Sequence, residues 1–345
     1  MEIFSPGKIN LALNVGRVRP DGYHPVDSVF HMIEYGDIVS LHPAEHLSVT
    51  CTYDLGISQE DNLVYKAAKM FDATFNTVSH FAIHIEKHLK AGGGLGGGSS
   101  NAAAVLYALC IIHNVRTTDA QLLALAATLG SDVPVFLAPT GASLMTNRGE
   151  KLARSLVPAA GVPLVIAWPQ NAHSNTGEVY RAFDDAPVAT KLMANLCDYL
   201  DLIVPQKNSA ASQTTVMSEA GTEAEAGAEA KAKSDSRDNV SFAPQDKLIA
   251  MQAHFLAGEL YNNLSEAAIR VTPEVGDVLL NLLAQPQTLG ATVSGSGACS
   301  FAITTSNNDA QKLAEQCKAA GFGAFATKLR SRGVAKINGI ESLYE

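Results

Sequence analysis

Residues 92–102 read Gly-Gly-Gly-Leu-Gly-Gly-Gly-Ser-Ser-Asn-Ala. Glycine lets a backbone approach a phosphate closely and turn its N–H groups inward, and a helix that starts directly afterwards adds unpaired donors. A flexible linker is the alternative. A linker rarely contains a residue such as Leu95, ends in a Ser-Ser-Asn helix cap, or separates a strand from an apolar helix within one domain. The stretch therefore predicts a cradle for a phosphate group.

This cradle differs from the two commonest nucleotide-binding loops. The Lys-Ser or Lys-Thr pair of a Walker loop is missing, and the glycines are not spaced as in a dinucleotide fingerprint. A third architecture is therefore needed.

Strands and helices are interleaved on both sides of the glycine run. Alternating apolar residues predict strands over residues 9–13, 39–41, 47–51 and 81–89. Helical spacing predicts helices over residues 62–75, 101–113, 120–129, 248–260 and 275–283. A loop is expected over 17–24, and two more strands should meet at a glycine turn within 292–303. Because the connections are short, the fold class is mixed α/β or α+β.

Length and charge limit the possible functions. The 345 residues are enough for about two domains, and 47% apolar with 17% charged residues is typical of a globular chain. The net charge of −9 leaves no basic face for nucleic acid. The longest apolar run, over 102–112, is too short for a membrane span, and no targeting segment is recognised, so we expect a cytoplasmic protein.

The cysteines and histidines indicate neither a disulfide framework nor a metal site. The five cysteines are widely spaced without a Cys-x-x-Cys pair, so we expect reduced thiols in or near the core. His80, His84 and His88 have the spacing of ligands on a helix face. The apolar alternation around them favours a solvated strand face instead, where His80 and His84 would lie about 13 Å apart.

The composition changes over residues 206–245. Ser, Thr, Ala, Glu, Lys and Gly dominate there, and such a stretch cannot bury enough surface to offset its ordering entropy. We interpret it as a low-complexity, solvent-exposed and disordered insertion.

Two further glycine-containing segments, 5–11 and 293–298, flank the glycine run in the sequence. Each alone reads as an ordinary turn. Together with the glycine run they match, in order and character, the three motifs of the GHMP kinases, the superfamily of galactokinase, homoserine kinase and mevalonate kinase. Asp-Gly-Tyr-His at 21–24 and Gly-Ser-Asp-Val-Pro-Val-Phe at 130–136 are further matches, so the resemblance covers nearly the whole chain except the insertion.

The resemblance implies an α+β fold with two domains. Residues 1–157 would form an ATP-binding domain like the second domain of ribosomal protein S5. Residues 158–345 would form a ferredoxin-like domain that carries the insertion, and the active site would lie in the cleft between the domains.

The resemblance also implies an activity. The Asp-Gly-Tyr-His segment is similar to that of the members that use ATP to phosphorylate the 2-hydroxyl of a cytidine-diphosphate-linked methylerythritol in the non-mevalonate isoprenoid pathway. Mg²⁺ is expected to accompany ATP, and the chain is expected to be a monomer or homodimer. A GHMP kinase for homoserine or a mevalonate-type acceptor is one alternative, which the Asp-Gly-Tyr-His segment disfavours. A catalytically silent metabolite sensor is another, which the retention of Lys8 and Asp132 disfavours.

The same resemblance assigns roles to individual residues. Asp132 matches the catalytic base that takes the hydroxyl proton, and Lys8 matches the lysine that faces it. The residues assigned to ATP are Asn62, Lys87, Lys90, Ala91, Gly92, Gly93, Gly94, Leu95, Gly96, Gly97, Gly98, Ser99 and Ser100. Those assigned to the acceptor are Asn10, Tyr23, His24, Phe30, Thr176 and Tyr180, with the aromatic residues clamping cytosine.

Each role has a structural alternative. Lys8 would otherwise be a solvated surface lysine, and Asp132 a turn or cap residue before Pro134. Asn10 would be a polar residue at a strand end, and Asn62 and Lys87 would be a cap or a surface charge. A lone aromatic is more often part of the core than a ligand contact.

Besides the insertion, which has no counterpart in the compact members, the chain departs from the pattern of the superfamily at two places. Lys90 stands where a proline usually precedes the glycine run, and Asn-Asn-Leu-Ser at 262–265 replaces an acidic Asn-Asp-Leu-Glu. Neither departure changes Lys8 or Asp132.

Overall fold

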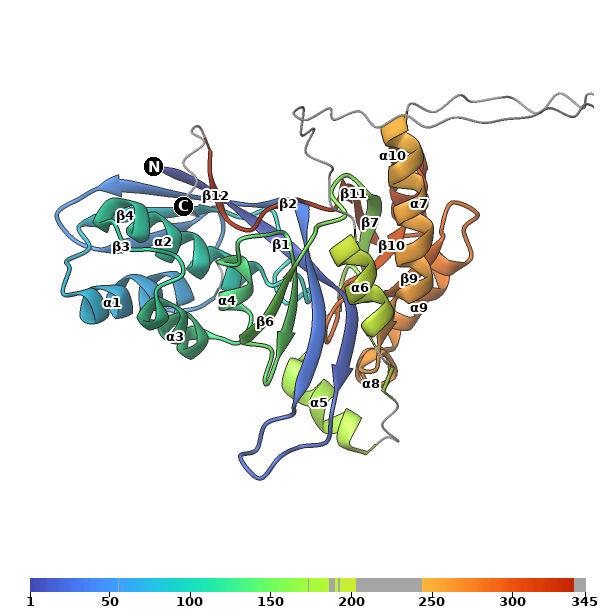
Figure 1. Cartoon of the computed structure of the whole chain (residues 1–345), viewed down its shortest axis with the longest axis horizontal. Helices are drawn as coiled ribbons and strands as arrows, with labels where there is room; N and C mark the ends of the chain where they lie inside the picture. The colour runs from blue at the N-terminus through green and yellow to red at the C-terminus, as the bar shows by residue number, and fades with distance from the viewer. Residues whose placement is uncertain (55, 173, 186–189, 192, 203–243, 338–345) are drawn as a thin grey trace, which may run out of the picture.

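The computed structural model describes residues 1–54, 56–172, 174–185, 190–191, 193–202 and 244–337 (Figure 1). The insertion predicted at 206–245 lies outside these residues except for its last two positions, which begin helix α7. No helix in the described ranges is long and apolar enough to cross a membrane.

The larger sheet is built around a long antiparallel ribbon of β1 and β2. Its path runs β12-β1-β2-β4-β3, with β5 pairing β2 and β6, and β8 pairing β1. The strands are β1 (Glu2–Val15), β2 (Val26–Pro43), β3 (Ser48–Cys51), β4 (Phe81–Glu86), β5 (Ala142–Thr146), β6 (Lys151–Leu156), β8 (Tyr261–Asn262) and β12 (Ala335–Lys336).

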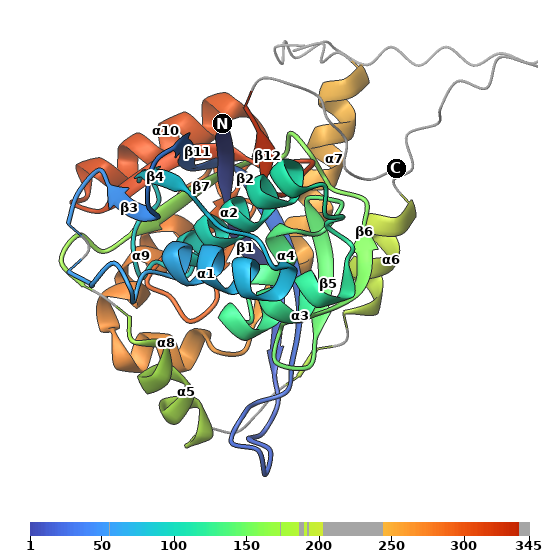
Figure 2. The ribbon, with the colours of Figure 1, turned by 90° about the vertical axis from the view of Figure 1, so that its left-hand side faces the viewer.

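Four helices cover one face of this sheet. They are α1 (Leu63–Phe75), α2 (Gly97–His113), α3 (Ala120–Leu129) and α4 (Val133–Phe136). Figure 2 shows α1, α2 and α3 in front of the sheet. Helix α2 is buried from Ser100 to Cys110 and packs in one cluster with the apolar faces of β2, β4 and α1. This continuous burial explains why its sequence is apolar on every side.

The smaller sheet has the order β11-β7-β10-β9 and is antiparallel throughout. Its strands are β7 (Pro163–Trp168), β9 (Gly290–Val293), β10 (Ser300–Ile303) and β11 (Gly323–Lys328). Counted along the chain, the order is fourth, first, third, second, with α9 before the second strand and α10 between the third and fourth. This is the ferredoxin-like arrangement that the resemblance implies, and the α+β class is confirmed.

Helices cover both faces of the smaller sheet. Leu164 and Ile166 of β7 pack with Leu256 of α7, whereas Val165 and Ala167 pack with α9 and α10. The helices of this part are α5 (Thr176–Asp184), α6 (Ala194–Leu202), α7 (Pro244–Glu259), α8 (Ser265–Val271), α9 (Pro273–Leu283) and α10 (Asn307–Ala319). Two-sided burial accounts for the continuous apolar run of β7.

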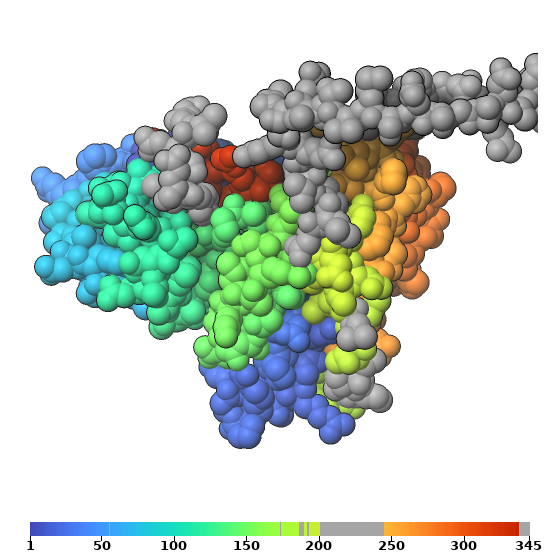
Figure 3. Space-filling model, in the orientation of Figure 1, coloured from blue at the N-terminus to red at the C-terminus, as the bar shows by residue number. Residues whose placement is uncertain are grey.

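The β1–β2 ribbon connects the two parts of the molecule. Ile3 belongs to the cluster under α2, Ile9 and Leu11 to the cluster shared with the smaller sheet, and Val15 to a third cluster with α5 and α8. The tip of the ribbon projects beside α5, at the bottom of Figure 3. One strand therefore contributes to three apolar clusters and carries polar residues between them.

Most expected elements are present, with two corrections. The strand predicted over 81–89 ends at Glu86, so only His84 lies in a strand, and His80 and His88 flank it. Helix α2 begins at Gly97, four residues before the predicted start. The prediction that Ser-Ser-Asn caps this helix is wrong, because Gly96 takes the N-cap position with a φ of 72°.

Candidate active site

A pocket of about 630 Å³ lies where β1, the glycine run, α4, α5 and the β9–β10 turn meet. Most of the predicted site residues line it. They are Lys8, Asn10, Phe30, Asn62, Lys87, Lys90, Ala91, Gly92, Gly93, Gly94, Leu95, Gly96, Gly97, Gly98, Ser99, Asp132, Thr176 and Tyr180. Tyr23, His24 and Ser100 do not line the pocket.

The glycine run has a shape that other residues could not take. Gly94 and Gly96 have φ values of 75° and 72°, in the left-handed region that favours glycine. A Cβ on Gly94 would lie 2.2 Å from the carbonyl oxygen of Ser294, and one on Gly96 would lie 2.9 Å from the Phe136 ring. No side chain caps the N-terminus of α2, so its first N–H groups and positive dipole end face the pocket.

The first and third motifs hold the glycine run in place. The Lys8 amide donates to the Leu95 carbonyl at 2.9 Å, and the Ser294 hydroxyl donates to the Gly94 carbonyl at 3.1 Å. The Cys299 amide donates to the Gly93 carbonyl at 3.1 Å. Leu95 is buried between the two parts of the molecule, which explains the single apolar residue in the run. The three motifs therefore meet at one place.

Lys8 is buried at the floor of the pocket. Its Nζ donates to Asn10 Oδ1 at 2.8 Å and lies 5.0 Å from the centroid of the Phe30 ring. Register shifts occur on both sides of the Lys8–Asn10 segment, where β1 pairs with β2. Such bulges re-aim side chains. Lys8 and Asn10 consequently line the pocket while Ile9 packs in the core.

Asp132 lies opposite Lys8, with Oδ2 3.5 Å from Lys8 Nζ. It occupies the N-cap position of α4, which has Pro134 in its first turn, yet its side chain makes no cap hydrogen bond. The carboxylate therefore remains available to the pocket, with 31% of the side chain exposed against 4% for Lys8. The turn-or-cap alternative accounts for the backbone of Asp132 but leaves its side chain unexplained.

Asn10 continues a buried chain of hydrogen bonds. Its Nδ2 donates to Ser28 Oγ at 2.7 Å, and Ser28 Oγ donates to the Ala12 carbonyl at 2.8 Å. This leaves Asn10 Oδ1 for Lys8 and fixes the direction of the amide. Asn10, which binds the Lys8 ammonium, is thus itself fixed by its hydrogen bond to Ser28.

Tyr180 and Thr176 place α5 against the pocket. Burial, together with the charge of Asp132, raises the pKa of Tyr180 to about 12, so its hydroxyl keeps its proton at neutral pH. Thr176 Oγ1 lies 2.9 Å from Ser296 Oγ in the β9–β10 turn. The helix is therefore joined to the same turn that holds the glycine run.

The aromatic residues expected around cytosine are only partly assembled. The ring centroids of His24 and Tyr180 are 5.0 Å apart, and His24 Nδ1 contacts the Gly16 carbonyl at 2.9 Å. Tyr23 is 52% exposed, with the guanidinium of Arg148 4.6 Å from its ring centroid. Phe30 lines the pocket beside Lys8. Arg148 lines the pocket and was not identified from the sequence, since it occupies an ordinary turn.

Asn62 and Lys87 lie at the end of the pocket beyond the glycine run. Asn62 is the N-cap of α1 and accepts from the Val64 amide, so the cap alternative holds for its side-chain oxygen. Lys87 is not a surface charge, because its side chain is buried in an ion pair with Asp37. Sequence reasoning missed Asp37, whose only signal was a charged residue inside an apolar strand.

The departures from the pattern of the superfamily lie at the edge of the site. Lys90 lines the pocket at the start of the glycine run. Asn262 is buried and donates from Nδ2 to the carbonyls of Val293 and Gly295, each at 2.8 Å. Asn263 pairs through its amide with the backbone of Val15. Both asparagines hold backbone segments that flank the pocket. Asn262 agrees with the pattern, whereas Asn263 stands where the pattern has aspartate, and its two hydrogen bonds to Val15 need no carboxylate.

The five cysteines and the histidines that the structure describes take no part in the pocket lining. All five cysteines are free, and burial raises the pKa of Cys299 to about 12, although the nearby Lys90 lowers it. Among the described residues, no cluster of three or more His, Cys, Asp or Glu side chains is arranged to hold a metal ion.

Comparison with known proteins places the chain in a family. The model of the GHMP kinases N-terminal domain matches residues 62–139, and that of the GHMP kinases C-terminal domain matches residues 250–322. A 4-diphosphocytidyl-2-C-methyl-D-erythritol kinase from Desulfitobacterium hafniense is 32% identical over 96% of this chain and 97% of its own length. The kinase of that name from Caulobacter vibrioides is 32% identical over 92% of this chain and 94% of its own length.

A solved structure agrees with these relatives. The crystal structure of a 4-(cytidine 5'-diphospho)-2C-methyl-D-erythritol kinase superposes with a TM-score of 0.68 at 27% identity, and the match covers 95% of this chain and 99% of that one. The likeness spans both sheets and therefore the pocket between them. With the fold, the three convergent motifs and relatives matched over nearly their whole length, the chain belongs to the 4-diphosphocytidyl-2-C-methyl-D-erythritol kinase family of the GHMP kinases.

Proposed function

We propose that this protein is an ATP-dependent kinase that phosphorylates the 2-hydroxyl of 4-(cytidine 5'-diphospho)-2-C-methyl-D-erythritol, a step toward isoprenoid precursors. One observation carries the proposal. The uncapped carboxylate of Asp132 faces the buried ammonium of Lys8 at 3.5 Å, in the same pocket as the glycine run and the open start of α2. A base, a cation and an anion cradle therefore share one cavity.

Phosphoryl transfer asks a protein mainly for positioning and charge stabilisation. Asp132 takes the proton of the 2-hydroxyl, and the hydroxyl oxygen forms a bond to the γ-phosphorus as the bond from that phosphorus to the β–γ bridging oxygen breaks. The products are the 2-phosphate and ADP. Lys8 stabilises negative charge that develops between the reacting oxygens. Asn10 holds Lys8 in place through its Oδ1.

The glycine run and the N-terminus of α2 would hold the triphosphate. The unpaired first N–H groups of a helix and its positive dipole end favour an anion there. Lys90, which stands where the pattern of the superfamily usually has proline, adds a positive charge to the pocket lining. Asn62 and Lys87, beyond the run, would contact the adenine side of ATP.

Mg²⁺ is expected to arrive with ATP. Proteins usually hold this ion through one or two oxygen side chains together with the substrate phosphates. The Ser99 hydroxyl and the Asp132 carboxylate line the pocket and provide such oxygens. The donor set fits the ion, which would neutralise charge on the transferred phosphoryl group.

The acceptor would enter from the side of α5 and the β1–β2 tip. Tyr180 presents a protonated hydroxyl, and His24 lies against its ring. Tyr23 has an exposed ring on which a base can stack. Aromatic stacking together with the hydrogen-bonding edge of histidine suits a pyrimidine better than an amino acid or a carboxylic acid.

A coupled assay of ATP consumption tests this proposal. The purified chain is supplied with the cytidine compound, its uridine analogue, homoserine or mevalonate in turn. We expect turnover with the cytidine compound far above that with the others. Equal turnover with homoserine or mevalonate would contradict the assigned acceptor, and the absence of turnover with every acceptor would favour the sensor alternative.

A further inference from the structure

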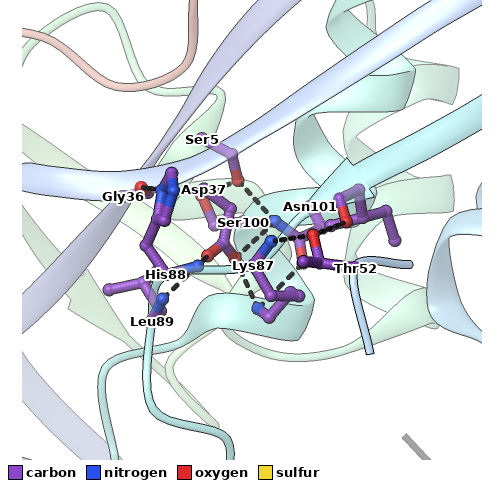
Figure 4. Close-up of polar contacts among 10 residues, drawn as sticks. Ser5, Gly36, Asp37, Thr52, Lys87, His88, Leu89, Ser100 and Asn101 are labelled. Atoms are coloured by element: carbon purple, nitrogen blue, oxygen red, sulfur yellow. Dashed lines mark hydrogen bonds and ion pairs between the residues drawn. The ribbon is translucent and has the colours of Figure 1, made fainter. Parts of the chain in front are cut away.

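Both ends of the glycine run are attached to one buried carboxylate. Asp37 lies in β2 with no exposed surface, and the pocket does not include it. Figure 4 shows its side chain between the segment that precedes the run and the first turns of the helix that follows it. The run itself consists largely of glycine, so its shape depends on where these two ends are held.

The two oxygens of Asp37 together bind residues on both sides of the run. Oδ1 accepts from the backbone amides of His88 at 2.7 Å and Leu89 at 2.8 Å, just before the run. Oδ2 accepts from Asn101 Nδ2 at 2.9 Å, in helix α2 just after it, and from the Lys87 ammonium. Four donors therefore satisfy a carboxylate that is fully removed from water, as a buried charge requires.

The same contacts fix Lys87 at the end of the pocket that we assign to ATP. Its ammonium also donates to Asn101 Oδ1 at 3.2 Å, and a Cβ added to Gly97 would lie 3.1 Å from Nζ. Asn101 in turn donates to Ser5 Oγ at 2.9 Å, and Ser5 donates to Ser100 Oγ at 2.7 Å. The ammonium is thus held against the first residue of α2 by groups that are themselves buried and hydrogen-bonded.

We propose that Asp37 is a positioning residue for ATP, which fixes the glycine run at both ends and holds the Lys87 ammonium toward the nucleotide. The proposal rests on the proposed function, because it assigns ATP to this end of the pocket. Asp37 acts through Lys87 and the glycine run and does not touch the reacting atoms. Its loss should weaken ATP binding and leave acceptor binding almost unchanged.

The test uses Asp37→Asn, Lys87→Met and the double variant in the full-length protein. Asparagine keeps an oxygen for the amides of His88 and Leu89 but turns an NH₂ group toward Lys87 and Asn101, where only an acceptor fits. ATP affinity is measured by calorimetry without acceptor, and KM values for both substrates are measured by the coupled assay. We expect a roughly 10-fold or greater loss of ATP affinity in Asp37→Asn, with less than a 2-fold change in the KM of the acceptor.

The double variant separates positioning from general stability. If Asp37 acts through Lys87, the double variant should bind ATP no more weakly than the weaker single variant. Asp72→Asn is the matched control, because Asp72 accepts from the Ser79 amide at 2.8 Å and the Thr77 hydroxyl at 2.9 Å and lies outside the pocket. It should lower the melting temperature without changing ATP affinity.

Several outcomes would overturn the proposal: unchanged ATP affinity in Asp37→Asn, equal losses for both substrates, or fully multiplicative effects in the double variant. Should Asp37→Asn fail to fold, Asn101→Ala removes one donor to Asp37 and leaves the ion pair, and it should still weaken ATP binding about 3-fold or more. Because ATP binding is measured without acceptor, a wrong acceptor assignment would appear as tight ATP binding without turnover, which leaves the Asp37 result readable.

Discussion

The two ends of the acceptor site are built in contrasting ways. Lys8 is only 4% exposed and is held by Asn10, which is itself held by Ser28. Tyr23, at the other end, is 52% exposed on a loop between two strands, and the Arg148 guanidinium lies beside its ring. The groups assigned to the reaction are preorganised by the core, whereas the groups assigned to recognition belong to a projecting ribbon tip. The difference suggests that chemistry and specificity can be changed separately.

The largest expected effect is a loss of turnover in variants of Asp132 and Lys8, at the buried end. Asp132→Asn removes the proton acceptor but keeps the size of the side chain, so turnover should fall by about 100-fold or more while both substrates still bind. Steady-state kinetics with binding measured by calorimetry checks this. Lys8→Ala should likewise lose rate more than acceptor affinity. Asp119→Asn is the control, because Asp119 caps α3 and asparagine caps equally well. Turnover near that of the unmodified protein in Asp132→Asn would show that another group takes the proton.

Substitutions at the exposed end, around Tyr23, should change the affinity for the acceptor. Stacking on an aromatic ring contributes roughly 1 to 3 kcal/mol per base, so Tyr23→Ala should raise the KM of the acceptor about 5-fold to 150-fold with little change in that of ATP. His24 variants should in addition discriminate less between the cytidine substrate and its uridine analogue. Val18→Ala changes another exposed residue of the same loop and serves as the control. An equal rise in the KM of ATP would contradict the assignment of Tyr23 to acceptor recognition alone.

Acid should destabilise the protein through a histidine of β2, which pairs with the strand that carries Lys8 and Asn10. His31 pairs with Ile9, between Lys8 and Asn10, and burial lowers its pKa from 6.5 to about 4 although a hydrogen bond to the Met32 carbonyl raises it. Between these two pKa values the unfolded chain binds a proton that the folded chain does not. The free energy of unfolding should therefore be unaffected by this group above pH 6.5 and should fall below it, by up to about 1.4 kcal/mol per pH unit, until about pH 4.

Denaturant unfolding across this pH range measures the slope. His31→Gln removes the titrating group. The free energy of unfolding of this variant should therefore change less with pH, by up to about 1.4 kcal/mol per pH unit, which corresponds to one proton. His46→Gln, at an exposed histidine, controls for the loss of an imidazole as such. Identical slopes for His31→Gln and the unmodified protein would mean that His31 is not the group that is protonated.

The smallest expected effect is that of Asn62, at the end of the pocket that we assign to ATP. Asn62→Ala removes the cap of α1 and should cost about 1 kcal/mol of unfolding free energy. Ser306→Ala removes the comparable cap of α10, outside the pocket. A contact between Asn62 and the adenine side predicts that only Asn62→Ala raises the KM of ATP. Equal KM values in both variants would leave Asn62 with the cap role alone.

Local patterns in the sequence predicted much of this architecture. Apolar spacing located α1, α3 and the β9–β10 pair, and the glycine run was expected to be a phosphate cradle because of its composition and its position before an apolar helix. The start of α2 was misplaced, since polar residues after a glycine run read as a cap. Here Gly96 takes the cap position because a side chain there would collide with Phe136.

Contacts between residues that lie far apart in the sequence could not be predicted from local patterns. Asp37 makes its contacts with residues 87–101, more than fifty positions away for most of them, so its local signal, a charge inside an apolar strand, does not reveal these partners. Arg148 reaches the pocket only because β5 pairs with β2 and brings its turn to the ribbon tip. The clamp residues were placed by resemblance, and the structure leaves Tyr23 outside the pocket lining.

The pairing of β12 with β1 has a consequence for the order in which the chain is made. Ile3 and Phe4 pair with Lys336 and Ala335, and Val334 packs into the cluster under α2. During synthesis, β1 leaves the ribosome long before these partners exist. The N-terminal part therefore emerges with β1 exposed along one edge, which is covered only once residues 334–336 leave the exit tunnel. The edge of β1 at Ile3 and Phe4 is thus covered by residues that are synthesised more than 300 positions later.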